Sequence, residues 1–253
     1  MKQKIIAVVN QKGGVGKTTT TVNVAAQLAA NGASVLLVDF DPQGNSSSGL
    51  GVQVPPDSPT TYDLLCQGAS LAETVHETNV PNLYIVPANA NLAGAEVSLA
   101  AELAREYKLR DALKMASHEY IFIDCPPSLG LLTVNALAAA DSLLIPVQAE
   151  YYALEGLSQL LTTVQRVRQG INPSLDILGV VVTMYDKRTT LSDQVLKELT
   201  NYFGDKLFKT IIPRNIRLAE APSFGKTIFA HDKWSKGARA YKALASEVLK
   251  RLQ

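Results

Sequence analysis

A glycine-rich stretch near the N-terminus, NQKGGVGKTTTT at residues 10–21, carries residue types that bind phosphate. It nearly matches the phosphate-binding loop pattern G-x-x-x-x-G-K-[ST]: Gly16, Lys17 and Thr18 fit, but Gln11 stands where the first glycine is expected. Glycines let backbone N–H groups turn toward phosphate oxygens, and the lysine supplies a cation at the β- and γ-phosphates. The Thr18 hydroxyl is a candidate Mg²⁺ ligand, so the stretch predicts a site for a nucleoside triphosphate with Mg²⁺.

A second lysine, Lys12, stands at the outer edge of this loop, five residues before Lys17. It cannot easily share phosphates that its own loop already surrounds. The loop residues predicted to contact the nucleotide are Lys12, Gly13, Gly14, Val15, Gly16, Lys17, Thr18 and Thr19.

Carboxylates follow two apolar runs, VLLVDFD and YIFID. A carboxylate at the C-terminal end of a strand lies on the ligand side of an open α/β sheet. Asp124 is therefore predicted to hold Mg²⁺ through a water, and Asp41 to lie beside Mg²⁺ and the attacking water. Asp39 is expected to support the Mg²⁺ shell or the loop. A pair of strand-end aspartates also serves as turn caps, and the residues alone leave that alternative open.

The elements that would position these residues alternate along the chain. Short Val- and Ile-rich runs predict strands buried on both faces, with helical patterns between them. We expect an α/β fold, with a mostly parallel twisted sheet, helices on both faces and a single domain over residues 1–253. The expected strands are 4–10, 34–39, 82–87, 120–124, 142–147, 178–184 and 206–212, and the expected helices are 17–31, 92–107, 108–117, 131–140, 154–169, 191–202 and 236–252. The Gly-, Ser- and Pro-rich segment 44–61 is expected to be a mobile surface loop.

Composition narrows the class of protein. The chain has 253 residues, of which 47% are hydrophobic and 19% charged, as in a soluble globular domain. Cys66 and Cys125 are too few for a disulfide framework or a four-thiolate metal site, so we expect a reducing, cytoplasmic environment. The most apolar run is interrupted by Asn135, Asp141 and Pro146, so no membrane span is predicted.

The net charge of +1 is unevenly spread. Residues 184–253 hold 14 Lys+Arg against 7 Asp+Glu, whereas the other 183 residues hold 10 against 16. A local basic excess points to a polyanion such as nucleic acid or anionic lipid, although lysines on solvated helix faces give the same count.

Four stretches together resemble one family. NQKGGVGKTTTTVN resembles the deviant Walker A loop, KGGVGKT, of the ParA/MinD family of ATPases, in which the first glycine of the loop is missing. VLLVDFDPQGN at 35–45 and YIFIDCPPSLG at 120–130 look like its two switch segments, and TIIPRNIRLAEAPSFGKTI at 210–228 is typical of the ParA/Soj partition branch. The resemblance covers nearly the whole chain, with the motifs in order.

The resemblance implies a DNA-partition ATPase that uses ATP and Mg²⁺. It implies an ATP sandwich homodimer in which Lys12 crosses to the partner's nucleotide, and an Asp41 that positions the attacking water. It further implies non-specific DNA binding on the nucleoid and hydrolysis stimulated by a ParB-like centromere-binding partner. The residues implied at adenine are Met184, Pro213 and Asn215, beside Thr183, and those implied at DNA are Lys187, Arg188, Arg217, Lys226, Lys233 and Lys236.

Other functions remain open at this point. A MinD-like membrane ATPase would need the apolar face of the last helix, Tyr241 to Leu252, to insert into lipid, but this face is typical of a packed helix. A nucleotide-dependent scaffold for another complex would carry the same loop. The cysteine sets of the nitrogenase iron protein and the arsenite pump are absent, and the three histidines show no metal spacing. Phe224 and Trp234 are expected in the core.

Overall fold

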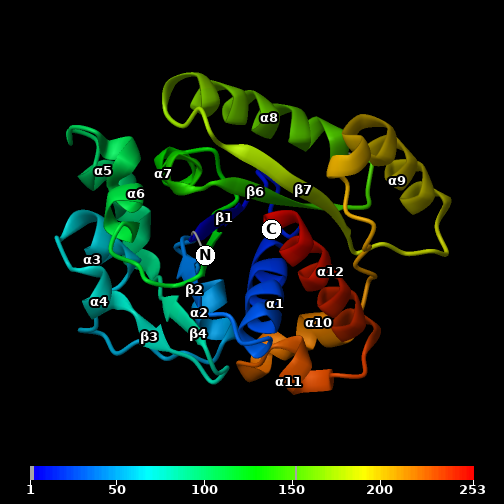
Figure 1. Ribbon diagram of the computed structural model, residues 1–253, viewed down its shortest axis with the longest axis horizontal. Helices are drawn as coiled ribbons and strands as arrows, with labels where there is room; N and C mark the ends of the chain where they lie inside the picture. The colour runs from blue at the N-terminus through cyan, green and yellow to red at the C-terminus, as the bar shows by residue number, and fades with distance from the viewer. Residues whose placement is uncertain (1–2, 152) are drawn as a thin grey trace.

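The computed structural model describes residues 3–151 and 153–253 of the chain, and its centre is a seven-stranded sheet (Figure 1). The strands follow the order β3-β4-β2-β5-β1-β6-β7, and all described neighbours are parallel except β3 and β4. The expected mostly parallel α/β sheet is thus confirmed. The strands are β1 Lys4–Val8, β2 Val35–Asp39, β3 His76–Glu77, β4 Leu83–Val86, β5 Tyr120–Asp124, β6 Ser142–Gln148 and β7 Asp176–Thr183.

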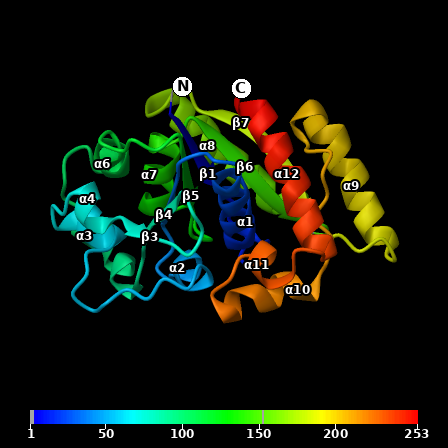
Figure 2. The same cartoon turned by 60° about the horizontal axis from the view of Figure 1, so that its bottom comes forward.

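Helices cover both faces of the sheet, because alternate residues of each central strand point to opposite sides. In β2, Leu36 and Val38 belong to the core under α7 and α8, whereas Val35 and Leu37 belong to the core under α1 and α12 (Figures 1 and 2). The α-helices are α1 Lys17–Ala30, α2 Asn45–Gly49, α3 Thr61–Cys66, α4 Leu71–Thr74, α5 Ala95–Ser98, α6 Lys108–Leu113, α7 Leu131–Ala139, α8 Ala153–Gly170, α9 Thr190–Phe203, α10 Ile216–Glu220, α11 Ile228–Asp232 and α12 Lys236–Leu252. Four 3₁₀ turns are also described, η1 Ala90–Gly94, η2 Arg105–Tyr107, η3 Gly204–Lys206 and η4 Ala221–Phe224.

The crossovers reverse direction at β1 and β5, which are neighbours in the sheet. β1 leads into α1 on one face, and β5 leads into α7 on the other. Loops that leave adjacent parallel strands for opposite faces open a crevice at the carboxyl ends of those strands, where ligands bind in open α/β sheets. The fold therefore brings the glycine-rich loop after β1 to the carboxylates that end β2 and β5.

The predicted strand 206–212 is wrong. This segment runs beside β7 but meets it only through single contacts, such as the amide of Phe208 donating to the carbonyl of Val180. Side chains of α12 take the other backbone groups. The Glu247 carboxylate accepts from the amides of Lys209 and Thr210 at 2.8 and 3.0 Å, and the Arg251 guanidinium donates to the carbonyls of Leu178, Lys206 and Leu207. Hydrogen bonds from side chains of α12 therefore replace the backbone hydrogen bonds that a strand would form at this edge of the sheet.

Three further expectations also need correction. The predicted helix 92–107 is broken into η1, α5 and η2, and the predicted helix 108–117 ends at Leu113. The short strand β3 was not predicted. Segment 44–61 is not simply a surface loop, because it contains α2, whose Ser46 and Ser47 are buried.

The apolar face of α12 is packed, as its pattern predicted. Tyr241, Leu244, Ala245 and Val248 are buried in the core that α12 shares with α1. This face is therefore not free to insert into lipid in this structure. Within the described residues, no helix combines the length and the apolar character needed to cross a membrane.

Candidate nucleotide site

The loop between β1 and α1 is held open as a cradle by its glycines and by two anchors. Gly14 and Gly16 have φ values of 73° and 89°, a conformation that side chains rarely adopt, and Gly16 is the N-cap of α1. The Thr183 hydroxyl at the end of β7 donates to the carbonyl of Val15 at 2.8 Å. The side-chain amide of Asn10 donates to the backbone carbonyl of Pro146 in β6 at 2.7 Å. Neighbouring strands β6 and β7 thus hold the loop in this shape.

Lys17 closes this cradle from the helix side. Its side chain is buried, and its ammonium donates to the backbone carbonyl of Lys12 at 3.0 Å. Burial lowers the pKa of Lys17, and the carboxylate of Asp124 opposes that shift. An ammonium that spans the loop and lacks full solvation is well placed to exchange a carbonyl for phosphate oxygens.

Lys12 behaves differently from Lys17. Its side chain leaves the loop and forms an ion pair with Glu150, in the segment that follows β6. The side chains of Lys12 and Glu150 keep 40% and 29% of their exposure, so the pair lies at the surface of the site. The two lysines of one loop therefore point to two different places.

Asp124 is fully buried, as Asp39 is, and accepts hydrogen bonds from several hydroxyls. Ser46 of α2 donates to it at 2.8 Å and Thr21 of α1 at 3.3 Å, and Thr18 also hydrogen-bonds to it. Burial raises the pKa of Asp124 to about 6, and these hydrogen bonds partly offset the rise. A carboxylate held between hydroxyls beside the loop fits a role in an outer shell around Mg²⁺.

Asp39 lies directly beside Asp124, because the two residues pair in register across β2 and β5. Its Oδ2 accepts from the amide and the hydroxyl of Ser47 at 2.8 and 2.6 Å. Burial, and then the neighbouring Asp124 carboxylate, raise the pKa of Asp39 to about 7. Asp41 is buried two residues further on, and its carboxylate accepts from the backbone amide of Gln43 at 3.0 Å. Its negative charge opposes the lowering by burial of the pKa of the loop residue Lys17, so it lies near the loop.

A hollow of about 410 Å³ continues the cradle on the β7 side. All three residues predicted at the base, Met184, Pro213 and Asn215, line it together with Gly16 and Thr19 of the loop. Its other lining residues are largely apolar: Thr183, Ile212, Arg214, Ile216, Leu218, Ala219 and Tyr241. An apolar slot that opens from a phosphate cradle has the shape and chemistry of a site for a nucleotide base.

The residues present thus fit ATP and Mg²⁺. The cradle offers backbone donors and Lys17 to phosphates, and Thr18, Asp41 and Asp124 provide oxygen ligands close together. Within 3–151 and 153–253, no group of three or more His, Cys, Asp or Glu side chains could hold a metal alone. A magnesium ion here therefore fits the usual arrangement, with few protein ligands and the rest from water and phosphate.

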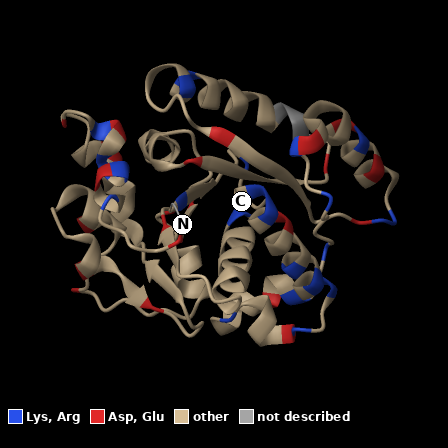
Figure 3. Ribbon diagram, in the orientation of Figure 1, with Lys and Arg blue, Asp and Glu red and all other residues tan. Residues whose placement is uncertain are grey.

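The residues predicted at DNA lie outside this crevice, on the β7–α9 loop and on the segment from α10 to α12 (Figure 3). Lys187, Arg188 and Lys236 line one shared hollow with Arg214. The two arginines already have partners: Arg188 donates twice to Asp186, and Arg217 pairs with Glu220. Lys187, Lys226, Lys233 and Lys236 are exposed and form no ion pair with a described carboxylate.

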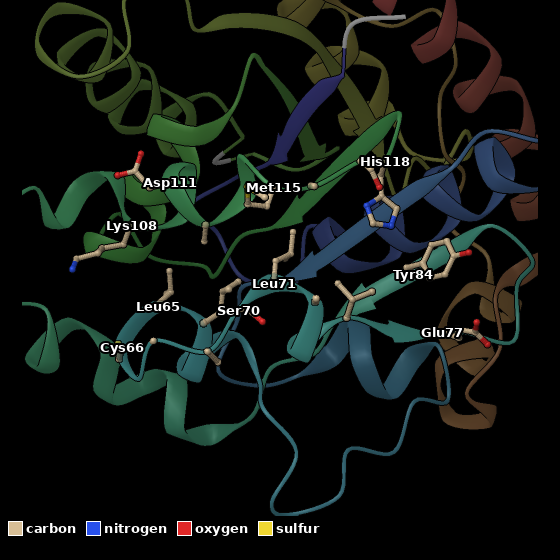
Figure 4. A pocket seen from close by; sticks show the side chains of 18 residues that line it. Leu65, Cys66, Ser70, Leu71, Glu77, Tyr84, Lys108, Asp111, Met115 and His118 are labelled. Atoms are coloured by element: carbon tan, nitrogen blue, oxygen red, sulfur yellow. The ribbon is translucent and has the colours of Figure 1, made fainter.

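A second hollow, of about 970 Å³, lies at the opposite end of β4 and β5 (Figure 4). Figure 4 shows Lys108, Asp111 and Met115 on one wall and Leu71 on the facing wall. Tyr84 and His118 stack edge to face at one end, with ring centroids 5.1 Å apart. None of its lining residues belongs to the glycine-rich loop or to the carboxylate cluster, so it is separate from the candidate nucleotide site.

Several residues of the site were not predicted. Asn10, Thr21, Ser46, Ser47 and Tyr241 contact the loop, the carboxylates or the base slot. A serine in a Gly- and Ser-rich segment gives no sequence signal for a buried carboxylate partner. The expectation that Phe224 and Trp234 are in the core is wrong, because they are 63% and 78% exposed.

Comparisons with known proteins agree with this geometry. A family model described as an AAA domain matches residues 3–177. The sporulation initiation inhibitor protein Soj of Bacillus subtilis is 55% identical over 247 residues, which cover 97% of this chain and 98% of that protein. The chromosome-partitioning ATPase Soj of Thermus thermophilus is 54% identical, and the match covers 100% of this chain and 98% of that protein. A solved structure of a Mycobacterium smegmatis cobyrinic acid a,c-diamide synthase with an ATP analogue and magnesium is 37% identical in sequence. The match covers 99% of this chain and 96% of that chain, with a TM-score of 0.86.

Proposed function

The chain belongs to the ParA/MinD family of ATPases, in the branch of the Soj and ParA chromosome-partitioning proteins, and from that premise we propose that it is an ATP-driven DNA-partition protein. ATP binding joins two copies into a sandwich dimer, and the dimer holds DNA without sequence preference. Hydrolysis returns single copies, which release the DNA. The observation that carries the proposal is the divided orientation of the two loop lysines: Lys17 turns inward, and Lys12 turns outward.

Within one copy, the residues divide the work of nucleotide binding. Lys17 exchanges the Lys12 carbonyl for the β- and γ-phosphates, and Thr18 and Asp124 hold Mg²⁺, Asp124 through a water. When bound at these residues, Mg²⁺ would supply positive charge to offset the negative charge that develops during phosphoryl transfer. Asp41, whose charge acts on Lys17, orients the attacking water. Positioning and charge stabilisation supply most of the rate in reactions of this class.

Lys12 makes the site incomplete in a single copy. Its ammonium pairs with Glu150 at the surface of the site, whereas the ammonium of Lys17 turns into the loop. When a second copy faces the first, Lys12 exchanges Glu150 for the partner's phosphates and adds a positive charge there. Hydrolysis therefore waits for dimerisation, which makes the ATPase a switch rather than a constitutive enzyme.

DNA binding is proposed on the basic surface at the C-terminal side of the sheet. The exposed lysines Lys187, Lys226, Lys233 and Lys236 contact phosphates, together with Arg188 and Arg217 once these release Asp186 and Glu220. Contacts to phosphates carry no sequence information, so binding is non-specific and salt dependent. A ParB-like partner at a centromere-like site stimulates hydrolysis by inserting a basic segment, and the protein thus distributes over the nucleoid.

The test compares DNA binding by the Asp41→Ala protein with Mg–ATP and with Mg–ADP. We expect tight binding in ATP and at least about tenfold weaker binding in ADP, because only ATP sustains the dimer. Oligomeric state is measured in parallel for the wild type and for Lys12→Ala, and a dimer is expected only with ATP and only with Lys12 present. Equal DNA affinity in the two nucleotides, or a Lys12→Ala protein that dimerises normally, contradicts the proposal.

A further inference from the structure

The short helix α2 lies beside the segment that carries α10 and α11 (Figure 2), and it packs against α1, β2 and η4. α2 spans only Asn45–Gly49, and it begins four residues after Asp41. Its buried serines face the carboxylates, and its end packs against η4. A segment of this length that is fixed at both ends has little freedom to absorb movement at either one.

The first anchor joins α2 to the ends of β2 and β5. Ser47 donates from both its amide and its hydroxyl to Asp39, and its hydroxyl oxygen accepts from the amide of Ala88 at 3.2 Å. Ser46 donates to Asp124 at 2.8 Å. Two consecutive serines therefore bind α2 to both carboxylates that border the Mg²⁺ position, and a displacement of either carboxylate must be shared by α2 or break these bonds.

The second anchor is a direct backbone contact between two glycines. Gly51 and Gly225 have φ values of 71° and 60°. A Cβ on Gly51 would lie 2.9 Å from the carbonyl oxygen of Gly225, and a Cβ on Gly225 would lie 2.7 Å from the Cα of Gly51. Just before this contact, Gly49 faces the ring of Pro222. Side chains are excluded from the contact on both sides, so the chain after α2 touches the backbone that carries Lys226.

We propose that α2 and Gly51 form a mechanical link that passes a change at the Asp39, Asp41 and Asp124 cluster to residues 221–235. Addition of a γ-phosphate with Mg²⁺ changes the surroundings of those carboxylates, and Ser46 and Ser47 carry the change to Gly51 and across to Gly225. Packed elements of this kind switch between discrete arrangements rather than deform continuously. The link explains how the nucleotide state reaches Lys226 and Lys233, and in that respect it rests on the proposed function, although the link itself does not require DNA.

Amide hydrogen exchange measures the link directly. The wild type is compared with Mg–AMPPNP and with Mg–ADP, so that the base slot is filled in both states and the two bound nucleotides differ at the γ-phosphate. We expect exchange in residues 221–235 to differ by about threefold or more between the two states in the wild type, and by less than about 1.5-fold in Gly51→Ala. Nucleotide affinity of the variant should stay within about twofold of wild type, because Gly51 does not line the site.

Gly68→Ala is the matched control. Gly68 has a φ of 75°, close to that of Gly51, but a Cβ there meets nothing within 4 Å. Both variants carry the same backbone strain, and only Gly51→Ala also forces the glycine contact apart. A Gly68→Ala protein that keeps the wild-type difference, beside a Gly51→Ala protein that loses it, supports the link. Equal behaviour of the two variants overturns it, and so does a wild type with no difference in 221–235.

The serine anchor gives an independent test that does not depend on a strained glycine. Ser47→Ala removes a hydroxyl that bonds both Asp39 and the amide of Ala88. Ser48→Ala removes an exposed hydroxyl that bonds only the backbone carbonyls of Gly44 and Asn45. We expect Ser47→Ala to lose the nucleotide difference in 221–235, Ser48→Ala to keep it and Ser47→Thr to restore most of it. Retention of the full difference by Ser47→Ala overturns the inference. A wild type that shows the difference but binds DNA equally in ATP and ADP instead leaves the link standing and removes the proposed function.

Discussion

Glu150 holds Lys12 within a single copy, so its charge should oppose dimerisation. If Lys12 must leave Glu150 to reach the partner's phosphates, every dimer breaks two such pairs. The side chains keep 40% and 29% of their exposure, and an ion pair this exposed is worth about 0.5–1 kcal/mol after screening. Two pairs then cost about 1–2 kcal/mol. Removal of the Glu150 charge should therefore tighten the ATP-dependent dimer by about 5–30-fold.

The assay is sedimentation of the Asp41→Ala protein with Mg–ATP over a range of concentrations, with and without Glu150→Gln. Glu102→Gln is the control, because Glu102 forms a comparable surface pair with Lys108, at 3.2 Å, far from the loop. High salt weakens exposed pairs, so the effect of Glu150→Gln should shrink as salt rises, and that of the control should stay near zero.

Two results for Glu150→Gln would contradict this prediction. A dimer that dissociates more readily in Glu150→Gln shows that Glu150 itself contributes to the dimer contact. An unchanged dissociation constant shows that the pair with Lys12 is not broken on dimerisation. Either result refutes the hypothesis that the ion pair with Glu150 opposes dimerisation and breaks when Lys12 reaches the partner's phosphates.

Three other outcomes follow from the site. Asp41→Ala should bind Mg–ATP within about threefold of wild type but release phosphate at least about 100-fold more slowly, as titration and phosphate assays will show; loss of binding would place Asp41 among the main ligands. The pKa of Asp39, raised to about 7, makes the folded protein bind a proton that the unfolded chain releases near pH 4, so the free energy of unfolding should fall as pH rises between about 4 and 7. Asp39→Asn removes this loss of stability with rising pH. In thermal melts without nucleotide, the Tm of Asp39→Asn should exceed that of the wild type at pH 8, and the two Tm values should be much closer at pH 5. A larger gain in Tm at pH 5 would refute the burial of a protonated Asp39. In DNA titrations with ATP, Lys236→Ala should lower the slope of log affinity against log salt by about one, and Arg217→Ala by less because Glu220 already neutralises Arg217; equal losses would contradict this pairing.

The parts of the site that lie on one short stretch were predictable from the sequence. The glycine-rich loop is contiguous, and its spacing alone places Lys17 and Thr18 at a helix start after a buried strand. The buried strands β1, β2 and β5 were predictable for a similar reason, because continuous apolar runs have few other solutions. The carboxylates could be placed at the same edge because they end these strands.

The edge beside β7 shows why one predicted strand was wrong. Residues 206–212, KLFKTII, contain four apolar residues but also two lysines, and a strand needs a partner for its backbone groups. Here Glu247 and Arg251, about 40 residues later, bind those groups instead. Local propensity contains no information about a carboxylate and a guanidinium supplied by a distant helix.

The prediction for segment 44–61 failed for the opposite reason. Its composition indicates a surface loop, but α2 within it lies in the core of the site. Serine competes with helix formation because its hydroxyl finds local backbone partners, and glycine adds conformational freedom. In α2 the hydroxyls of Ser46 and Ser47 instead bond carboxylates of β5 and β2, 78 and 8 residues away. The same Gly content permits the contact of Gly51 with Gly225, which any side chain would prevent. Composition that weakens local structure thus allows the close backbone approach through which we infer that nucleotide state reaches the basic surface.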